Sequence, residues 1–410
     1  MRRPTVLFIN RVFPPVHGAS GRVLKDLAQA FAREGWHVTV ISSGPKAGEE
    51  RIPGVRIIRV KGPERPASVF AYVWVWIKML ILALRLKGRH LVVTMSDPPL
   101  TVFAGQIIAR WKKSRHINWC HDLYPELLPV IGMRIPDWAM ARLKSLRNRC
   151  MQRCDKVVVV GRCMAKYLAQ EGIDARKIAM IPNWPDVELT DSEMIETTGK
   201  TYQDLDPEVA RPFDEQKKSQ ERFRILYAGN LGRAHCVETV IDAAEVLQKQ
   251  ESDVEFVFVG NGKRFDELAE LRAKRGLDNI RLLPFQPVEN LREMMESGYV
   301  HLISMKDDAA GYLVPSKLYA ALAVARPSIF IGPSQSETAK VLNDFEAGVV
   351  VAHGDAEALV KAVNGYRHDT DLWQVGQNGA ARARDVFTPQ DSLKAWAGRA
   401  MDVVHDDLKA

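Results

Sequence analysis

Residues 5–41 decide the fold, with the sequence TVLFINRVFPPVHGASGRVLKDLAQAFAREGWHVTVI. An apolar run over Val6–Asn10 predicts a buried strand, and two prolines then break the chain. Helical spacing follows over Arg22–Arg33, Gly35 ends the helix, and Val38–Ile41 has the composition of a second strand. A strand, a helix and a strand in this order predict parallel strands with a helix packed on the sheet.

The same alternation continues along both halves of the chain. Further strands are expected at 55–60, 91–95, 117–120, 156–160 and 177–181, with helices at 100–113 and 138–153. In the second half, strands are expected at 224–228, 255–260, 280–283, 300–304, 328–331 and 348–351, with helices at 237–250, 263–275, 290–297, 316–323 and 337–343. The prediction is an α/β fold of two Rossmann-like, doubly wound parallel-sheet domains that face a cleft.

The domain boundaries follow from changes in composition. We expect an N-terminal domain over 1–183, a linker with an acidic insertion over 184–222, and a second domain over 223–387. A helix over 388–410 completes the chain.

Composition and charge narrow the classes of function. The chain has 410 residues, of which 46% are hydrophobic and 26% charged, so it is neither a disordered chain nor a multi-span membrane protein. Residues 1–115 carry 20 basic and 6 acidic side chains, although the net charge of the chain is +7. Such a region predicts an anionic partner, either nucleic acid or a membrane surface. It contains no recognised nucleic-acid-binding module, so we expect no nucleic acid.

Two patterns that resemble metal sites have simpler interpretations. Residues 186–215 hold ten acidic and two basic side chains, and the triplet Asp204-Leu-Asp206 can hold a metal on a nucleotide-sugar or be part of a solvated charged segment. Cys150 and Cys154 lie one helical turn apart without further ligands, which favours small buried hydrophobic residues. We expect no metal and no cofactor. Few cysteines and no secretory signal predict the cytoplasm.

Four loops at strand ends carry candidate functional residues. The first contains Gly18, Ser20, Gly21 and Arg22 before a helix, where glycine lets backbone N–H groups approach an anion; a turn that needs glycine is an equal alternative. The second places His121 and Asp122 at the end of a strand, where they can bind and deprotonate a hydroxyl group or cap the following turn.

The other two loops belong to the second half. Tyr227-Ala-Gly-Asn-Leu-Gly-Arg-Ala-His235 ends its first strand and Gly260-Asn-Gly262 its second, and both have the composition of phosphate-binding loops. In the fourth loop, Pro315-Ser-Lys317, the lysine stands in the first helical turn, where its charge is unfavourable against the helix dipole. A bound anion shared with the free N–H groups would reverse that effect; the alternative is an ordinary exposed lysine.

Four motifs in this order resemble the family-four GT-B glycosyltransferases, especially the branch that makes colanic-acid, O-antigen and other exopolysaccharide units. They are Ile181-Pro-Asn-Trp184, Ala228-Gly-Asn-Leu-Gly232, Gly260-Asn-Gly262 and Pro315-Ser-Lys-Leu318. The resemblance covers residues 6–363 and implies a GT-B fold and metal-independent, retaining transfer from a nucleotide-sugar. It also implies a donor site in the C-terminal domain, an acceptor site in the N-terminal domain, and a last helix that packs back on the latter.

The resemblance assigns roles by position. Catalytic roles fall on His121, Asp122 and Lys317. Substrate-binding roles fall on Gly18, Ser20, Gly21, Arg22, Asn183, Gly229, Asn230, Gly232, Arg233, His235, Asn261, Gly262, Phe285, Tyr312, Pro315 and Ser316. Many members have Arg and Lys at 230 and 235 and two glutamates at the positions of Tyr312 and Ala320 here.

The expected activity is transfer of a hexosyl or N-acetylhexosaminyl group, from a UDP-sugar, to a polyprenyl-diphosphate-linked saccharide in bacterial surface polysaccharide synthesis. Because both motif glutamates are absent, a degenerate sugar-nucleotide-binding protein without activity is the alternative. Val69–Leu86 is almost entirely apolar with two tryptophans, and it is either a core helix or an interfacial one. With the basic residues nearby, it predicts peripheral binding to the anionic inner face of the cell membrane.

Overall fold

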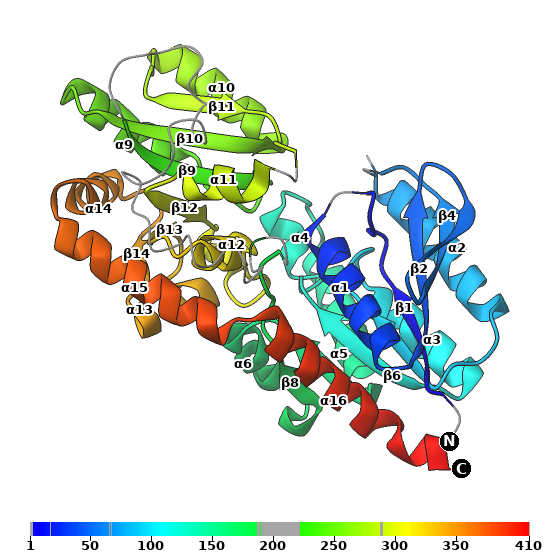
Figure 1. Cartoon of the computed structure of the whole chain (residues 1–410). Coiled ribbons are helices and arrows are strands. Elements are labelled where there is room, and N and C mark those ends of the chain that lie inside the picture. Colours follow the sequence, from blue (N-terminus) through cyan, green and yellow to red (C-terminus); the bar gives the residue numbers. More distant parts are fainter. Residues whose placement is uncertain are drawn as a thin grey trace.

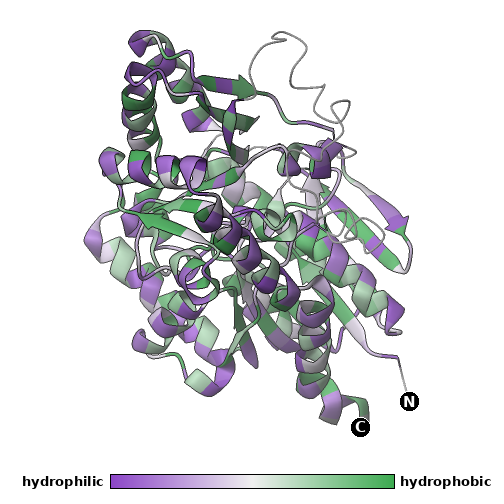
Figure 2. Cartoon of the chain, turned by 60° about the vertical axis from the view of Figure 1, so that its left-hand side comes forward, coloured by the Kyte–Doolittle hydropathy of each residue, from purple (hydrophilic) through white to green (hydrophobic). Residues whose placement is uncertain are grey.

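The computed structural model describes residues 3–16, 18–64, 66, 68–186, 189, 222–287 and 290–409. These residues form two α/β domains that lie side by side (Figure 1). Most of the acidic segment, including Asp204-Leu-Asp206, lies outside the described residues. The strands of both domains are largely hydrophobic, as Figure 2 shows by its colouring. The predicted pair of doubly wound parallel sheets is confirmed.

An eight-stranded sheet with the order β3-β4-β2-β1-β5-β6-β7-β8 organises the N-terminal domain. Its strands are β1 (Thr5–Ile9), β2 (His37–Gly44), β3 (Gly48–Ile52), β4 (Val55–Lys61), β5 (Leu91–Thr94), β6 (Arg115–Cys120), β7 (Lys156–Val159) and β8 (Ile178–Met180). Its helices are α1 (Ala19–Arg33), α2 (Val69–Arg85), α3 (Thr101–Lys112), α4 (Leu127–Val130), α5 (Asp137–Arg153) and α6 (Arg162–Gln170). All described pairs are parallel except β3 with β4.

A six-stranded, fully parallel sheet with the order β11-β10-β9-β12-β13-β14 organises the described part of the C-terminal domain. Its strands are β9 (Phe223–Asn230), β10 (Val254–Asn261), β11 (Ile280–Leu283), β12 (Val300–Ser304), β13 (Ser328–Ile331) and β14 (Gly348–Val351). Its helices are α9 (Glu238–Lys249), α10 (Lys263–Arg275), α11 (Leu291–Glu296), α12 (Lys317–Ala323), α13 (Glu337–Phe345), α14 (Ala356–His368) and α15 (Thr370–Val386).

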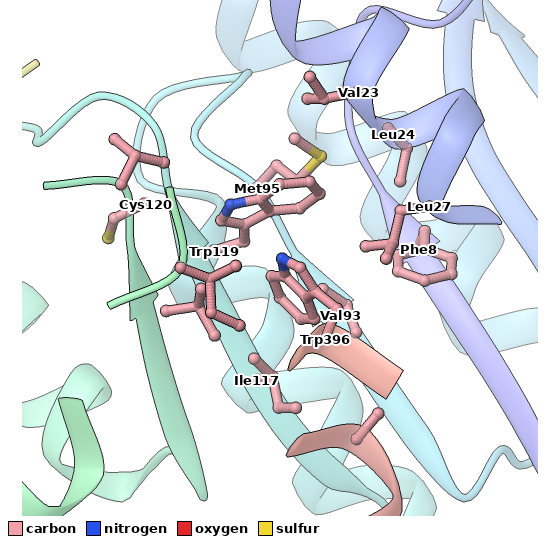
Figure 3. Packing of buried hydrophobic residues seen from close by; sticks show 14 of the residues in the cluster. Phe8, Val23, Leu24, Leu27, Val93, Met95, Ile117, Trp119, Cys120 and Trp396 are labelled. Carbon is pink, nitrogen blue, oxygen red and sulfur yellow. The ribbon is translucent and has the colours of Figure 1, made fainter. Parts of the chain in front are cut away.

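The long helix α16 (Pro389–Lys409) follows α15 and runs back along the N-terminal domain (Figure 1). Its Trp396 is fully buried, and its ring lies 4.7 Å from the ring of Trp119 in β6 (Figure 3). Nearer the end of the helix, Asp407 accepts a hydrogen bond of 2.8 Å from Nε of Arg115. The core of the N-terminal domain is therefore completed by a helix that follows both sheets in the sequence.

A hydrophobic cluster and a buried carboxylate are among the contacts that join the domains directly. Leu127 and Val130 of α4 share one hydrophobic cluster with residues of the second sheet and of α12. On α13, the carboxylate of Glu337 is buried and accepts from the backbone N–H and from Nε of Arg162, at 2.6 and 2.9 Å. Gly161 permits this approach, because a Cβ atom there would lie 2.9 Å from the Val314 side chain.

Helix α2 lies at the outer edge of the N-terminal domain, away from the C-terminal domain (Figure 1). One face, with Val75, Met79 and Ala83, is buried against the sheet and α3. The opposite face exposes apolar side chains, among them Phe70 and Trp74. Helix α2 is therefore only half buried, whereas a core helix would be buried on all sides. Among the described helices, none combines the length and the apolar composition that a bilayer-crossing helix needs.

Candidate active site in the interdomain cleft

The carboxyl ends of β5 and β6 hold the first group of polar side chains. The Ser96 hydroxyl accepts from the backbone N–H groups of His121 and Asp122, at 2.8 and 3.0 Å. This contact ties together two loops that follow neighbouring parallel strands. In sheets of this kind ligands bind beyond the carboxyl ends of the strands, so His121 and Asp122 stand where a substrate is expected.

Burial gives these two residues unusual proton affinities. Desolvation, together with the nearby Asp97, raises the pKa of Asp122 to about 7. Desolvation lowers the pKa of His121 to about 3, so its ring is neutral. The ring lies 4.6 Å from that of Trp119, and its Nδ1 is 3.4 Å from Nδ2 of Asn183. Asp122 is thus a carboxyl group that exchanges its proton near neutral pH.

Sequence reasoning missed an ion pair beside Asp122. Arg11 donates two hydrogen bonds of 2.7 and 2.8 Å to the carboxylate of Asp97, and its guanidinium lies 5.5 Å from the ring centroid of Tyr72 in α2. Arg11 directly follows the first strand region, and Asp97 precedes Pro98 just beyond β5. The only sign of this ion pair in the sequence is that two residues of opposite charge follow two strands.

The glycine loop before α1 packs closely against Val12. A Cβ atom at Gly18 or Gly21 would lie 2.8 Å from Cγ1 of Val12, so both glycines are needed for close packing. Ser20 accepts a hydrogen bond of 3.3 Å from Asn10. Arg22 donates to the carbonyl oxygens of Trp184 and Pro185, at 3.0 and 2.9 Å. In this structure the Arg22 guanidinium holds the interdomain linker, whereas the sequence prediction placed it toward donor phosphates.

The loops after β9 and β10 approach each other closely. Gly229 and Gly262 have φ values of +116° and +140°, which favour glycine. A Cβ atom on Gly262 would lie 2.3 Å from the carbonyl oxygen of Leu231. The Asn261 side chain accepts a hydrogen bond of 2.6 Å from the N–H of Gly262. Glycine is therefore required here to bring two strand ends together at the start of α10.

Lys317 lies over this pair of loops. Its Nζ donates to the carbonyl oxygen of Asn230 at 3.1 Å and is 4.8 Å from the ring centroid of Tyr227. Burial lowers the pKa of Lys317 to about 8. Across the described residues, no carboxylate pairs with this ammonium group. A half-buried cation beside glycine-rich strand ends suits an anionic ligand such as a diphosphate.

Besides Lys317, the loop after β9 offers little positive charge at the strand ends, because Arg233 is bonded elsewhere and His235 is neutral. Arg233 is exposed and donates to the carbonyl oxygen of Ile131 at 3.0 Å, across the domain boundary. Burial lowers the pKa of His235 to about 3, and its Nδ1 donates to the carbonyl oxygen of Ser304 at 2.6 Å. Asn230 is exposed, and Gly232 lies beside its side chain.

The loop with Asp122 in the N-terminal domain and the loop that leads to Lys317 in the C-terminal domain meet. Asp122 forms an isolated β-bridge with Leu313, and the N–H of Leu123 donates to the carbonyl oxygen of Tyr312 at 2.7 Å. The loop then continues through buried Pro315 and partly buried Ser316 into α12 with Lys317. Phe285, by contrast, is 52% exposed and lies two residues beyond the end of β11.

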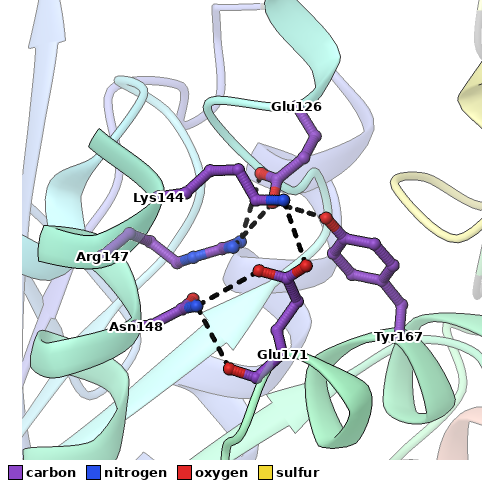
Figure 4. Close-up of polar contacts among 6 residues, drawn as sticks. All are labelled: Glu126, Lys144, Arg147, Asn148, Tyr167 and Glu171. Atoms are coloured by element: carbon purple, nitrogen blue, oxygen red, sulfur yellow. Dashed lines mark hydrogen bonds and ion pairs between the residues drawn. The ribbon is translucent and has the colours of Figure 1, made fainter. Parts of the chain in front are cut away.

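Glu126, four residues after Asp122, is buried and belongs to a polar network of the N-terminal domain (Figure 4). Glu126 accepts from Nη2 of Arg147 at 2.7 Å and from the Tyr167 hydroxyl at 2.9 Å. Lys144 bridges from Glu126 to Glu171, with 3.0 Å to the latter. The Tyr167 ring also packs edge-on against Tyr312, 5.1 Å away, so the network reaches the C-terminal domain.

A cavity of about 560 Å³ lies where α4 faces the C-terminal domain. Both signs of charge line it, including Arg233, Lys306, Glu238 and Glu267. In the part of the chain that the structure describes, no three His, Cys, Asp or Glu side chains gather as a metal site would require. Cys154 is buried and Cys150 half-buried, both in the N-terminal core.

Two family comparisons divide the chain as its fold does. Residues 20–189 match Glycosyltransferase Family 4, and residues 210–381 match Glycosyl transferases group 1. The chain belongs to the family-four GT-B glycosyltransferases. The predicted resemblance is therefore confirmed.

Curated relatives and solved structures agree with this family. The chain is 27% identical over 214 residues to the putative colanic acid biosynthesis glycosyl transferase WcaI of Escherichia coli K12, which covers 52% of this chain and 49% of that protein. It is 20% identical to the probable glycosyltransferase WbjE of Pseudomonas aeruginosa, over 69% of this chain and 67% of that protein. The match thus spans about half the length of WcaI.

Among solved structures, Anabaena HepE in complex with UDP-glucose superposes with a TM-score of 0.68 at 15% identity, covering 97% of this chain and 99% of that one. Sucrose-phosphate synthase from Thermosynechococcus elongatus superposes with a TM-score of 0.76 at 17% identity, covering 98% and 100%. At these identities the likeness establishes the fold.

Proposed function

We propose that this protein is a retaining glycosyltransferase that moves a sugar from a nucleotide-sugar to a hydroxyl group of a saccharide acceptor. The observation that carries the proposal is the β-bridge between Asp122 and Leu313. It sets a proton-exchanging carboxyl group of one domain beside the loop that leads to the cation Lys317 of the other. An acceptor hydroxyl and a leaving diphosphate need these two chemical environments side by side.

On the donor side, the diphosphate binds the glycine-rich ends of β9 and β10. Lys317 stands above those ends and neutralises the negative charge that grows on the diphosphate as the glycosidic C1–O bond breaks. Because Asn230 and His235 are uncharged, Lys317 carries a larger share of this stabilisation than in a loop with three cations. UDP is the proposed nucleotide, since HepE, which shares the fold, was solved with UDP-glucose.

On the acceptor side, Asp122 orients the attacking hydroxyl group, and the ion pair of Arg11 with Asp97 fixes the wall beside it. The acceptor oxygen bonds to C1 as the diphosphate departs, and the hydroxyl proton passes to the leaving diphosphate. Asp122 is given no role as a nucleophile. We propose that no metal takes part, and that the neutral His121 ring contacts the sugar.

The names of WcaI and WbjE support an acceptor from surface polysaccharide biosynthesis. We propose a polyprenyl-diphosphate-linked saccharide as acceptor and a hexosyl or N-acetylhexosaminyl group as the transferred sugar. The protein would then work at the inner face of the cell membrane, with α2 as the contact. The exposed apolar face of α2 supports this location.

A screen of nucleotide-sugars by thermal unfolding tests the donor assignment. A ligand present at 100 times its Kd stabilises the folded protein by about 2.7 kcal/mol. The donor identified in this way is then supplied with lipid-linked acceptor, and radiolabel transfer into the lipid fraction is measured. Failure of every nucleotide-sugar to shift unfolding would contradict the proposal.

A catalytically inactive sugar-nucleotide-binding protein is the second candidate, because Tyr312 and Ala320 occupy the positions of the usual glutamates. Such a protein would show the thermal shift without any turnover. Slow hydrolysis of the nucleotide-sugar in the absence of acceptor separates the two candidates, since only the transferase releases free sugar.

A further inference from the structure

A second cavity, of about 490 Å³, lies between α2 and the segments that follow β2 and β4. Its volume is within the ~300–1,000 Å³ range of small-molecule sites. Six apolar residues line it: Pro45, Pro63, Phe70, Ala71, Trp74 and Val75. We call it the α2 groove. Gly62 lets the chain pass close beneath α2, because a Cβ atom there would lie 2.7 Å from the Val75 side chain.

Two lysines give the α2 groove a cationic end. Lys61 and Lys78 both line it, and Nζ of Lys78 donates to the carbonyl oxygen of Lys61 at 2.9 Å. The Lys78 ammonium also lies 5.3 Å from the ring centroid of Trp74. Within the described ranges, neither lysine forms an ion pair with a carboxylate. An apolar channel with two uncompensated cations is complementary to a lipid chain with a phosphorylated head group.

The α2 groove adjoins the acceptor side of the cleft. Tyr72 lies next to Ala71 on α2 and contacts Arg11, which holds Asp97 beside Asp122. The helix that lines the groove therefore also carries Tyr72, which contacts the ion pair beside Asp122. This shared helix distinguishes the groove from an isolated surface depression.

Both ends of α2 are also suited to a bilayer. Phe70 at the groove is 77% exposed, and Trp111 of α3, near the opposite end of α2 where Lys112 donates to the carbonyl oxygen of Leu84, is also 77% exposed. The exposed Arg110 and Lys113 flank Trp111. Exposed aromatic residues among basic side chains are typical of surfaces that insert into anionic membranes.

We propose that the α2 groove binds the isoprenoid chain nearest the head group of a polyprenyl-diphosphate-linked acceptor, with Lys61 and Lys78 at the diphosphate. This inference rests on the proposed function, and it names the part of the protein that selects the acceptor's lipid. The saccharide end of the same molecule extends along Tyr72 and Arg11 toward Asp122.

The test compares binding to two kinds of phosphatidylcholine vesicle. One contains polyprenyl diphosphate, and the other contains phosphatidylglycerol at equal surface charge. We expect the full-length protein to co-sediment more strongly with the polyprenyl vesicles, and soluble inorganic diphosphate to reverse only part of that binding. Lys78→Ala and Trp74→Ser should each weaken the polyprenyl binding about tenfold, as expected for loss of one charge-assisted or aromatic contact.

Matched controls use residues far from α2. Trp138→Ser replaces a tryptophan that is 76% exposed on α5, and Lys166→Ala replaces an exposed lysine on α6. Both controls should bind like the unmodified protein. Equal binding to the two vesicle types would reduce the groove to a cationic surface that binds any anionic lipid, and full reversal by inorganic diphosphate would remove the role of the isoprenoid chain. Unchanged binding by folded Lys78→Ala and Trp74→Ser proteins would likewise overturn the proposal.

The readout does not depend on catalysis. The nucleotide-induced thermal shift is measured on the same variants and should be preserved, because the donor loops lie in the other domain. A protein that binds polyprenyl vesicles but shows no shift with any nucleotide-sugar would contradict the proposed function alone. A protein with the shift but without selective vesicle binding would contradict the α2 groove alone.

Discussion

Replacement of Lys317 by methionine tests the donor site most directly, because it keeps the apolar stem and removes the charge. Nζ lies 3.1 Å from one backbone carbonyl oxygen and 4.8 Å from an aromatic ring, so it is held in place before a ligand arrives. A charge-assisted hydrogen bond from such a group contributes ~1.5–3 kcal/mol. The Lys317→Met variant should therefore bind UDP roughly ten- to hundredfold more weakly.

The assay is titration calorimetry with UDP and with uridine. The loss should appear for UDP and be nearly absent for uridine, which lacks phosphates. Lys361→Met, at an exposed position on α14, is the matched control and should change neither affinity. An equal loss for both ligands, or an unchanged UDP affinity in a folded variant, would refute the assignment of Lys317 to the diphosphate.

The pH dependence gives a second test of the same residue. Burial lowers the pKa of Lys317 to about 8 in the unliganded protein. Because deprotonation removes the positive charge, UDP affinity should fall as the pH rises through that value. The fall should be smaller in Lys317→Met, since no charge remains to be lost.

Three other changes have distinct expected outcomes. Asp122→Asn should lower transfer more than nucleotide affinity. Because folding raises the pKa of this carboxyl group to about 7, the folded protein loses stability as the pH rises from the acid range to that value. Urea unfolding of the variant should show no such loss. Arg147→Met removes the buried ion pair of Arg147 with Glu126 and leaves that carboxylate only the Tyr167 hydroxyl and Lys144 at 3.8 Å, so it should cost ~3 kcal/mol of unfolding free energy, and adding Glu126→Gln should restore part of it. Gly262→Ala places a Cβ atom 2.3 Å from a backbone oxygen and should reduce UDP binding, whereas Gly48→Ala, in open space, should not change calorimetric affinity.

The sequence predicted the bounds of four strands in the second sheet. The strands β11, β12, β13 and β14 begin and end at the predicted residues, because each is a short, mainly apolar run. The edge strand β3 was missed, since its sequence Gly-Glu-Glu-Arg-Ile is mostly exposed and has no buried face to mark it. No elements were predicted over 356–386, where α14 and α15 form.

The sequence predicted only those residues of the candidate site that stand in motifs at the ends of strands. His121 and Lys317 follow recognisable motifs, and their loops do meet across the two domains. The pairing of Arg11 with Asp97 joins residues 86 positions apart, which no local pattern records. Similarly, Arg22 stands in a glycine-rich loop, but the backbone oxygens that engage it arrive from a linker far along the chain.

The return of α16 has a consequence for biosynthesis. Trp396 packs against Trp119 and belongs to the core of the domain that the ribosome makes first. During translation, the hydrophobic core of the N-terminal domain is complete only after α16, which follows both sheets in the sequence, has been synthesised. Domains generally fold in the order of synthesis, but here the N-terminal domain completes its core only after the C-terminal domain has been synthesised. Until α16 is synthesised, the nascent chain therefore exposes the apolar surface that Trp396 later covers, including Trp119 of β6, and chaperone dependence should concentrate in that interval.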